Sequence, residues 1–324
     1  MISPTTPPSS VSRDARIYCD YAQLVRLQSQ SQSFHLLPNL KAGSALSGRH
    51  QSLFRGRGLN FEELRHYQLG DDIRNLDWKV TMRTGKPHVR TYTEEKDRDV
   101  VIVVDQRSAM FFSSVQVMKS VVAAEIAALC AWRVLKDSDR VGFLLADSQR
   151  LTWSKSKRTQ NDLLAQLKRI AHANQALDAA SVDAAGTQFD DIVQLLLRLK
   201  LKSTTLILIS DWSDASTQNI SHLQRLQQHN DVLAIMVSDQ FEQQLPTHAS
   251  TQGWVMGNGS QQISIQNEAM LQVVNRQLQD RIESKREQLS KLMHRYHIPL
   301  VELDTSGQHI AQFKKTVGGC KDGS

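Results

Sequence analysis

Short apolar runs, rich in β-branched residues, recur in this chain, and a segment with helical periodicity separates each from the next. They cover residues 100–104, 141–145, 206–210 and 232–237. Runs of this kind are typical of strands that are buried on both faces, as in the middle of a parallel sheet. The intervening segments repeat apolar residues at three- and four-residue steps, which indicates amphipathic helices. The alternation predicts a doubly wound α/β domain with a mostly parallel sheet.

Weaker signals predict further elements. Residues 151–153 fit an edge strand and residues 298–303 a final strand. A helical period over residues 271–296 predicts a helix of roughly 30 residues, or ~45 Å at 1.5 Å per residue. Near the N-terminus, residues 15–27 fit a short amphipathic helix, and the Gln- and Ser-rich residues 28–33 are typical of a polar linker.

Composition excludes several classes of protein. Of the 324 residues 40% are hydrophobic, which is enough for a real core and argues against a disordered chain. Cys19, Cys130 and Cys320 are far apart and form no CxxC pair, so neither a disulfide scaffold nor a cysteine zinc site is indicated. No apolar stretch reaches the ~18 residues of a membrane-spanning helix. Residues 1–12 do not resemble a signal peptide, and we expect a soluble, cytoplasmic protein with no membrane contact.

The charge is unevenly distributed. Lys and Arg number 39 against 33 Asp and Glu, a formal net charge of +6, and residues 41–90 hold ten basic against five acidic side chains. A basic segment can attract nucleic acid or an acidic protein surface. Interspersed signs are equally typical of an ordinary solvated surface. Nucleic-acid binding through residues 41–90 therefore stays as an alternative function.

Two aspartates come directly after buried strands. Asp105 follows residues 100–104, and Asp211 follows residues 206–210, while Thr187 precedes a predicted helix. The carboxyl ends of parallel strands share one edge, where such sheets bind ligands. Two carboxylates and a hydroxyl there suit Mg²⁺, but they also suit the capping of loops and helices. A metal-dependent phosphate-ester hydrolase using Asp105 and Asp211 is an alternative function, although no candidate general base stands beside them.

A gapped pattern of glycine, arginine and acidic residues precedes the first buried strand. Its segments are 48–52 (GRHQS), 56–65 (GRGLNFEELR), 67–78 (YQLGDDIRNLDW) and 91–95 (TYTEE), with Asp239, Glu242, Leu245 and Pro246 further on. Spanning roughly residues 45–245, the pattern resembles the signature of the DUF58 family. The resemblance implies a domain similar to von Willebrand factor A, a small, mostly β satellite, and association with a MoxR-type AAA+ ATPase.

These expectations divide the chain into four segments. Residues 1–44 are predicted to be a polar tail with a short helix, and residues 45–95 the satellite. Residues 96–310 are predicted to be the von Willebrand A-like domain, and residues 311–324 a C-terminal tail.

The resemblance also implies a degenerate cation site. A von Willebrand A-type site uses Asp-x-Ser-x-Ser after the first strand, a threonine from a later loop and an aspartate after a later strand. Asp105, Thr187 and Asp211 can match these positions, but Arg107 and Ala109 replace the two serines. The departure implies that no metal binds. The guanidinium of Arg107 can neutralise the carboxylates instead.

The segment from Gly70 to Trp78 has two interpretations, a structural scaffold and a docking surface, and they are compatible. Glycine permits a tight turn, its aspartates can accept backbone amides or pair with Arg65 or Arg74, and a buried tryptophan can anchor the satellite. The motif residues are Gly70, Asp71, Asp72, Arg74, Asp77 and Trp78.

Nothing in the sequence indicates catalysis. The chain has no GxxxxGK[ST] phosphate loop, no Gly-x-Ser-x-Gly elbow, and no cysteine with a recognisable histidine partner. Together with the resemblance, this predicts a non-catalytic protein-binding module without a cofactor, an adaptor or chaperone-like partner of a MoxR-type AAA+ ATPase that acts on an unknown client. Binding is expected at the sheet edge, where Arg107 either pairs with a carboxylate of the ATPase or pairs internally.

Overall fold

The computed structural model describes residues 14–34, 36, 51–52, 59–69, 71–94, 98–240, 255–257, 262–264, 272–273, 276, 284 and 287–318. The chain divides into two compact units. Residues 41–98 form one, which we call the satellite unit, and residues 1–40 with 99–324 form the other, the main unit. The predicted satellite range, 45–95, falls inside the first, whereas the predicted N-terminal segment, 1–44, is divided between the two.

A six-stranded sheet forms the centre of the main unit. Its strands are β4 (Asp99–Gln106), β5 (Arg140–Asp147), β6 (Leu151–Lys157), β7 (Thr204–Ser210), β8 (Asp231–Ser238) and β11 (Leu300–Asp304). The strand order is β11-β8-β7-β4-β5-β6. All neighbours are parallel except β5 and β6, which pair antiparallel at one edge. The predicted mostly parallel sheet, its edge strand and its final strand are confirmed.

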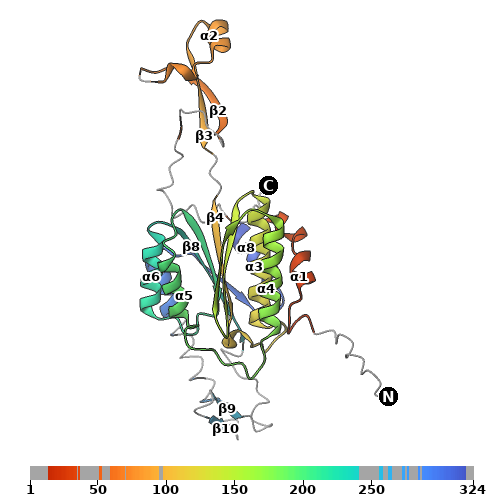
Figure 1. Cartoon of the computed structure of the whole chain (residues 1–324). Helices are drawn as coiled ribbons and strands as arrows, with labels where there is room; N and C mark the ends of the chain where they lie inside the picture. The colour runs from red at the N-terminus through yellow and green to blue at the C-terminus, as the bar shows by residue number, and fades with distance from the viewer. Residues whose placement is uncertain are drawn as a thin grey trace, which may run out of the picture. The chain divides into compact units, whose positions relative to one another are not determined.

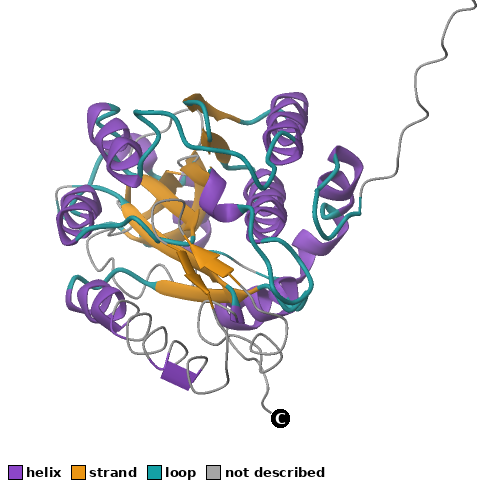
Figure 2. Ribbon diagram, turned by 90° about the horizontal axis from the view of Figure 1, so that it is seen from below, coloured by secondary structure: helices purple, strands orange, loops and turns teal. Residues whose placement is uncertain are grey.

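Helices cover both faces of this sheet. They are α1 (Tyr21–Arg26), α3 (Lys119–Lys136), α4 (Gln160–Gln175), α5 (Phe189–Arg198), α6 (Thr217–Gln227) and α8 (His309–Gly318), with the 3-10 turns η1 (Ser29–Ser33) and η3 (Ser108–Met110). Figure 1 shows α5 and α6 on one side of the sheet and α1, α3, α4 and α8 on the other. Seen from below, the strands lie between the two groups of helices (Figure 2). The mixed α/β layering is as predicted.

Strand β4 is apolar at every position of its central run because helices cover both of its faces. Its alternate residues Val100, Ile102 and Val104 belong to the hydrophobic cluster under α3 and α4. Val101 and Val103 belong to the cluster under α5 and α6. Successive side chains of a strand point to opposite faces, so a strand between two helix layers must be apolar at every position.

Residues 14–34 are part of the main core, and the prediction of a polar linker over residues 28–33 is wrong. The helix predicted over residues 15–27 is the shorter α1, which begins after its N-cap Asp20. The indole of Trp132 in α3 donates to the Leu24 carbonyl at 3.0 Å. Beyond η1, Phe34 is buried, and its ring contacts that of Phe313 in α8, with 5.6 Å between centroids. Phe34 thus anchors the Gln/Ser stretch to the core. The polar composition of the stretch gave no sign of this contact.

The C-terminal end is also more ordered than predicted. Phe313 and Val317 of α8 are buried in the cluster under α3, so most of the predicted tail, 311–324, is an amphipathic helix. The predicted helix over residues 271–296 lies largely outside the described residues, although 287–295 are helical. The short strands β9 (Val255–Gly257) and β10 (Gln262–Ser264) pair antiparallel.

The satellite unit contains a small antiparallel sheet and short helices. Its elements are β1 (Gln51–Ser52), β2 (Leu59–His66), η2 (Ile73–Asn75), α2 (Trp78–Thr84) and β3 (His88–Glu94). The strand order is β1-β3-β2. Helix α2 ends at Gly85, whose left-handed backbone (φ 69°) lets its amide bond back to Thr81. In the part of the chain that the structure describes, no helix is long and apolar enough to cross a membrane.

Candidate functional site

The predicted site residues meet at the carboxyl edge of the main sheet. Asp105 lies near the end of β4, Asp211 directly follows β7, and Thr187 precedes α5. Neighbouring strands β4 and β7 run parallel in register, Val104 opposite Ile209, so their ends lie side by side. The alternation of strands and helices therefore placed these three residues together. Arg107, also a predicted position, lies with them, and the structure adds Lys119, Ser210 and Asp214.

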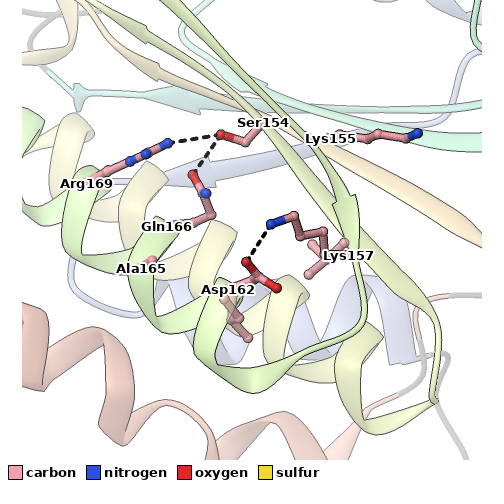
Figure 3. A pocket seen from close by; sticks show the side chains of 9 residues that line it. Ser154, Lys155, Lys157, Asp162, Ala165, Gln166 and Arg169 are labelled. Carbon is pink, nitrogen blue, oxygen red and sulfur yellow. Dashed lines mark hydrogen bonds and ion pairs between the residues drawn. The ribbon is translucent and has the colours of Figure 1, made fainter.

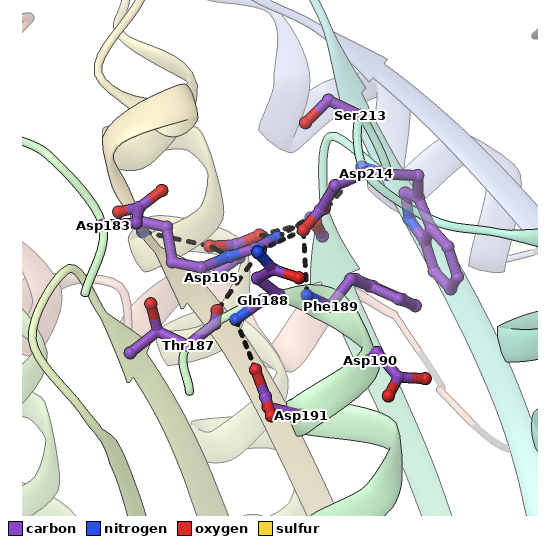
Figure 4. A network of polar contacts seen from close by, with 12 residues as sticks. Asp105, Asp183, Thr187, Gln188, Phe189, Asp190, Asp191, Ser213 and Asp214 are labelled. Carbon is purple, nitrogen blue, oxygen red and sulfur yellow. Dashed lines mark hydrogen bonds and ion pairs between the residues drawn. The ribbon is translucent and has the colours of Figure 1, made fainter. Parts of the chain in front are cut away.

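Arg107 is buried at the centre of this edge. Its Nε and Nη2 donate to the two carboxylate oxygens of Asp105 at 3.0 and 2.7 Å. Its Nη1 and Nη2 donate to those of Asp214 at 2.6 and 3.1 Å, and Nη1 also reaches the Thr187 carbonyl at 3.3 Å. A guanidinium has five N–H donors, and these contacts use them all. Asp105, near the end of β4, and Asp214, in the loop after β7, lie close together there (Figure 4).

Of the two alternatives for Arg107, the structure shows internal pairing. The side chain is 4% exposed, and its donors are occupied within the chain. Asp214, which sequence reasoning missed, supplies the second carboxylate and also accepts the Phe189 amide at 2.9 Å, at the start of α5. The only sequence signal for Asp214 was its position three residues after Asp211.

Burial and pairing act against each other on these carboxyls. Burial raises the pKa of Asp105 above its usual range, while the Arg107 guanidinium and the Ser210 hydroxyl, which donates at 2.6 Å, favour the charged form. At Asp214 burial acts in the same direction, but the hydrogen bonds from Arg107 outweigh it and hold the pKa below its usual value. Burial tends to lower the pKa of Arg107, but the pairs with Asp105 and Asp214 outweigh burial and raise that pKa.

Lys119 forms a second buried ion pair at this edge. Its Nζ donates to Asp211 Oδ2 at 2.9 Å, and both side chains are under 5% exposed. Burial tends to raise the pKa of Asp211, but the Lys119 ammonium outweighs burial and holds that pKa below its usual range. Lys119 was missed from sequence. Its signal was a lysine at the start of an otherwise apolar helix, where a charge is expensive without a partner.

The backbone after Asp211 is strained in a way that fixes this pair. Trp212 adopts a left-handed conformation (φ 58°), which is rare for a bulky residue and costs of order 1–3 kcal/mol. Its indole donates to the Ile235 carbonyl at 3.1 Å, and its ring lies 4.8 Å from that of Phe189. Burial of Trp212 between these partners holds the turn, and the turn directs Asp211 toward Lys119.

The remaining positions of the degenerate motif do not face the carboxylates. The Thr187 hydroxyl donates to the Ala184 carbonyl at 2.8 Å. Ala109 is exposed in η3, and its neighbour Ser108 donates through its amide and hydroxyl to Asp183 at 2.8 and 2.7 Å. Local capping therefore uses the hydroxyls that a cation would need.

These residues do not fit a divalent cation. Mg²⁺ requires free carboxylate oxygens and hydroxyl or water ligands. Here a guanidinium and an ammonium already occupy oxygens of Asp105, Asp211 and Asp214. Within the described ranges, no group of three or more His, Cys, Asp or Glu side chains is arranged to hold a metal ion.

Asp239 connects this edge to the neighbouring strand ends. It is buried, accepts the amide of Ser114 at 2.9 Å and the hydroxyl of Thr305 at 2.5 Å, and also accepts the Ser114 hydroxyl. It thereby joins the end of β8 to the loop before α3 and to the end of β11. The other residues of that later segment, Glu242, Leu245 and Pro246, lie outside the described residues.

In the satellite motif the aspartates support the local fold. Asp71 forms a bidentate pair with Arg65 at 2.6 and 2.9 Å and accepts the Gln68 amide at 2.8 Å. Asp72 caps η2 by accepting the Arg74 amide at 3.0 Å. The hypothesis that these aspartates pair with arginines and accept amides is confirmed. The first residue of the motif, Gly70, lies outside the described residues.

Asp77 has the same double role at α2. It caps the helix by accepting the Val80 amide at 3.1 Å, and it pairs with Arg90 of β3 at 2.6 and 2.7 Å. The Val80 amide and then the Arg90 guanidinium hold the pKa of Asp77 below its usual range. The prediction that Trp78 is a buried anchor is wrong, because its side chain is 62% exposed. The capping carboxylate turns toward β3, and the next side chain therefore turns outward.

A separate cavity of about 300 Å³ lies between β6 and α4 (Figure 3). Arg169 donates to the Ser154 hydroxyl at 3.3 Å, and Lys157 pairs with Asp162 at 2.8 Å. Lys157 stands opposite Val141 at the start of β5, so the cavity is at the other end of the sheet from Asp105. Paired surface charges line it, without a buried polar group directed into it.

Comparison with known proteins identifies relatives without an assigned function. The family model described as "Protein of unknown function DUF58" matches residues 63–287. Uncharacterized proteins of Mycobacterium bovis and Mycobacterium tuberculosis are 28% identical over 221 residues, covering 68% of this chain and 68% of theirs.

Two solved structures are similar to the chain at low sequence identity. One is the conserved hypothetical protein BatB from Bacteroides thetaiotaomicron (TM-score 0.40, 13% identity, 68% of this chain and 97% of that chain). The other is an aerotolerance-related membrane protein from Bacteroides fragilis (TM-score 0.36, 12% identity, 67% and 98%). Because the family model matches well over half of the residues, this protein belongs to the DUF58 family.

Proposed function

We propose that this protein is a non-catalytic protein-binding module of the cytoplasm. In this proposal its main unit is a von Willebrand A-like domain with a degenerate cation site. It acts as an adaptor or chaperone-like partner of a MoxR-type AAA+ ATPase in the assembly or activation of another complex. The ATPase supplies the nucleotide chemistry, and this chain supplies recognition.

One observation carries the proposal. At the edge where a parallel sheet binds its ligand, the chain's own Arg107 and Lys119 form ion pairs with Asp105, Asp211 and Asp214. Every donor of the guanidinium is occupied. Internal ion pairs of this kind favour a rigid, structural role for this edge over the binding and release of a metal or a substrate.

The hydrolase alternative is less favoured by the same contacts. A metal-dependent phosphate-ester hydrolase needs Asp105 and Asp211 as metal ligands. Using them as metal ligands would leave the buried Lys119 without its carboxylate and would take one of two carboxylates from the buried Arg107, at a cost of several kcal/mol. The nucleic-acid alternative also has fewer available cations than the sequence suggests, because Arg65 and Arg90 of the satellite pair with Asp71 and Asp77.

The test is direct binding between purified proteins. The full chain is titrated with the MoxR-type ATPase of the same organism in the presence of ATP, ADP or no nucleotide. Specific binding in at least one nucleotide state, with a change in ATP hydrolysis by the ATPase, is the expected result. The absence of binding in all three states would refute the partnership. Turnover of p-nitrophenyl phosphate with Mg²⁺, abolished in Asp105→Ala, would establish the hydrolase instead.

A further inference from the structure

Helix α2 of the satellite unit turns apolar side chains outward. Trp78 is 62% exposed and Met82 86%, and Ile73 of η2, just ahead of the helix, is 61% exposed. Of the ten large apolar side chains that are exposed in the described residues, five lie between Leu64 and Met82. Exposed apolar groups that gather in this way indicate an interaction site.

The inward side of the same helix is mostly polar, with Val80 half-buried. Asp77 is 7% exposed and pairs with Arg90. The Thr81 hydroxyl accepts the His88 amide at 3.1 Å. A helix that stabilises its own unit buries its apolar face and exposes its polar one. The arrangement at α2 is the reverse, so the outward apolar row does not serve the fold of the satellite.

A basic row runs beside the apolar row. Trp78 and Met82 are four residues apart and share one face, and so do Lys79 and Arg83. Both basic side chains are exposed, and neither forms an ion pair with another residue that the structure describes. Two like charges at this spacing destabilise a helix slightly. The basic row, like the apolar one, contributes nothing to the stability of the isolated unit.

We propose that the outward face of α2, formed by Ile73, Trp78, Lys79, Met82 and Arg83, docks into an apolar groove of a partner protein whose rim carries Asp and Glu side chains. Apolar anchors four residues apart are what a groove for a short helix recognises. The basic row fixes the charge of the rim, because complementary charge steers association and orients the helix. The inference rests on the proposed function only in its choice of the AAA+ ATPase as the first probe.

Basic and apolar side chains together also suit an anionic membrane surface. The carboxylate of Asp72 argues for a protein. Its side chain is 30% exposed directly beside Ile73 and lies 3.7 Å from the Arg74 guanidinium, so an anionic leaflet would repel it and compete with it for Arg74. A protein rim can place a donor opposite it. A seven-residue helix also presents only two turns, about 10 Å at 1.5 Å per residue, which matches a groove better than an extended lipid surface.

The experiment measures binding of the full-length protein to the purified ATPase with two α2 variants. Trp78→Ser/Met82→Ser removes the apolar row, and Lys79→Glu/Arg83→Glu reverses the basic row. Each is expected to weaken binding at least tenfold, and binding of the wild type is expected to weaken as salt rises. Circular dichroism spectra should be unchanged, because all four side chains are exposed.

Matched controls carry the same chemical changes on the main unit. Tyr21→Ser removes an exposed apolar side chain, and Lys155→Glu/Lys168→Glu reverses two exposed charges. Both controls should bind as the wild type does. Wild-type binding by the α2 variants would overturn the proposal. So would a wild-type protein that binds phosphatidylglycerol vesicles through these same residues.

A second arm keeps the inference testable if the ATPase does not bind at all, a result that refutes the proposed function by itself. A photo-crosslinking amino acid is placed at Met82, and at Tyr21 as control, in the full-length protein in cells. A Met82-specific adduct whose peptide, mapped by mass spectrometry, combines apolar residues with Asp or Glu supports the docking surface. No adduct, or a peptide without acidic residues, overturns it.

Discussion

Aspartate–arginine pairs occur in both units of this protein, but their surroundings differ. At the sheet edge of the main unit, the side chains of Arg107 and Asp105 are 4% and 1% exposed. In the satellite, those of Arg90 and Asp77 are 45% and 8% exposed. The first pair occupies the place where a ligand would bind, whereas the second holds a small scaffold that exposes Trp78 and Met82. In the satellite the polar side chains at the start of α2 turn inward, and the apolar side chains beside them are therefore available for binding.

The difference has an energetic consequence. A buried ion pair contributes little net stability, but removing one partner leaves an uncompensated charge in a medium that solvates it poorly. An exposed pair is screened by water, and breaking it matters little. Substitutions at the sheet edge should therefore change stability, and substitutions on the satellite's outer face should change binding.

The largest effect is expected for Arg107→Ala. The substitution leaves Asp105 and Asp214 without their shared partner, and the free energy of unfolding should fall by about 3–5 kcal/mol. Urea denaturation followed by tryptophan fluorescence measures it. In the satellite, Arg65→Ala, which breaks the pair with Asp71, should lower stability much less. Comparable losses for the two variants would remove the contrast between the units.

A somewhat smaller effect is expected for Lys119→Met, which keeps the aliphatic volume but leaves Asp211 buried and unpaired. The expected loss is about 3 kcal/mol, the lower end of the range for a broken buried pair. Adding Asp211→Leu should recover most of that loss, because no charge then remains. If the double variant is no more stable than Lys119→Met alone, the cost does not come from an uncompensated charge.

Acid should destabilise the main unit through Asp211 and Asp214. Their pKa values are lowered in the folded protein, so their contribution to stability is present above the unfolded pKa of about 3.9 and is lost as the pH falls through the folded value. Asp105, whose pKa burial raises, acts in the opposite direction. Unfolding measured from pH 6 to pH 3 should show a shallower acid loss in Asp211→Asn than in the wild type. Equal slopes would contradict the pairing with Lys119.

A small effect is expected for Trp78→Ala. Since the indole is 62% exposed, stability should change by no more than about 0.5 kcal/mol. Val89→Ala, at a fully buried position of the same unit, should cost at least about 1 kcal/mol. Thermal unfolding of both variants measures the difference. A large loss at Trp78 would show that its side chain is covered in solution.

No effect is expected from Mg²⁺ or Mn²⁺. Calorimetric titration of the wild type should detect no binding tighter than about 100 µM, which corresponds to about −5.5 kcal/mol. The reason is that Arg107 and Lys119 already occupy the carboxylate oxygens that a metal would need. Tighter binding that disappears in Asp211→Ala would mean that the ion pairs open to admit a metal.

Several features of the fold could be read from single segments. The run from Val100 to Val104 had to be a strand covered on both faces, because every position of it is apolar. The same logic identified β5, β7 and β8, and the parallel order then placed Asp105 and Asp211 at one edge. Helix α3 could be predicted although Glu125 interrupts its apolar run. The Glu125 carboxylate accepts a hydrogen bond from the Gln23 side chain and forms another with the His309 ring.

The partners of charged residues could not be read in this way. Lys119 and Asp211 are separated by 92 residues, and Arg107 and Asp214 by 107, and no local pattern connects them. The outward position of Trp78 was equally hidden, because residue type predicts only an average tendency to be buried. The capping of α2 by Asp77 determined which way the neighbouring side chain turned.

By itself the sequence determined the architecture, because the alternation of apolar runs and helical periods allows few arrangements in which every apolar face is covered. It also determined the family, through the spacing of the satellite motif. Only the tertiary structure decided that the cations at the sheet edge are the chain's own and that Trp78 and Met82 of the satellite face outward. The physical reason is that periodicity is a local property, whereas the pairing of charges and the burial of a side chain depend on which distant segments meet.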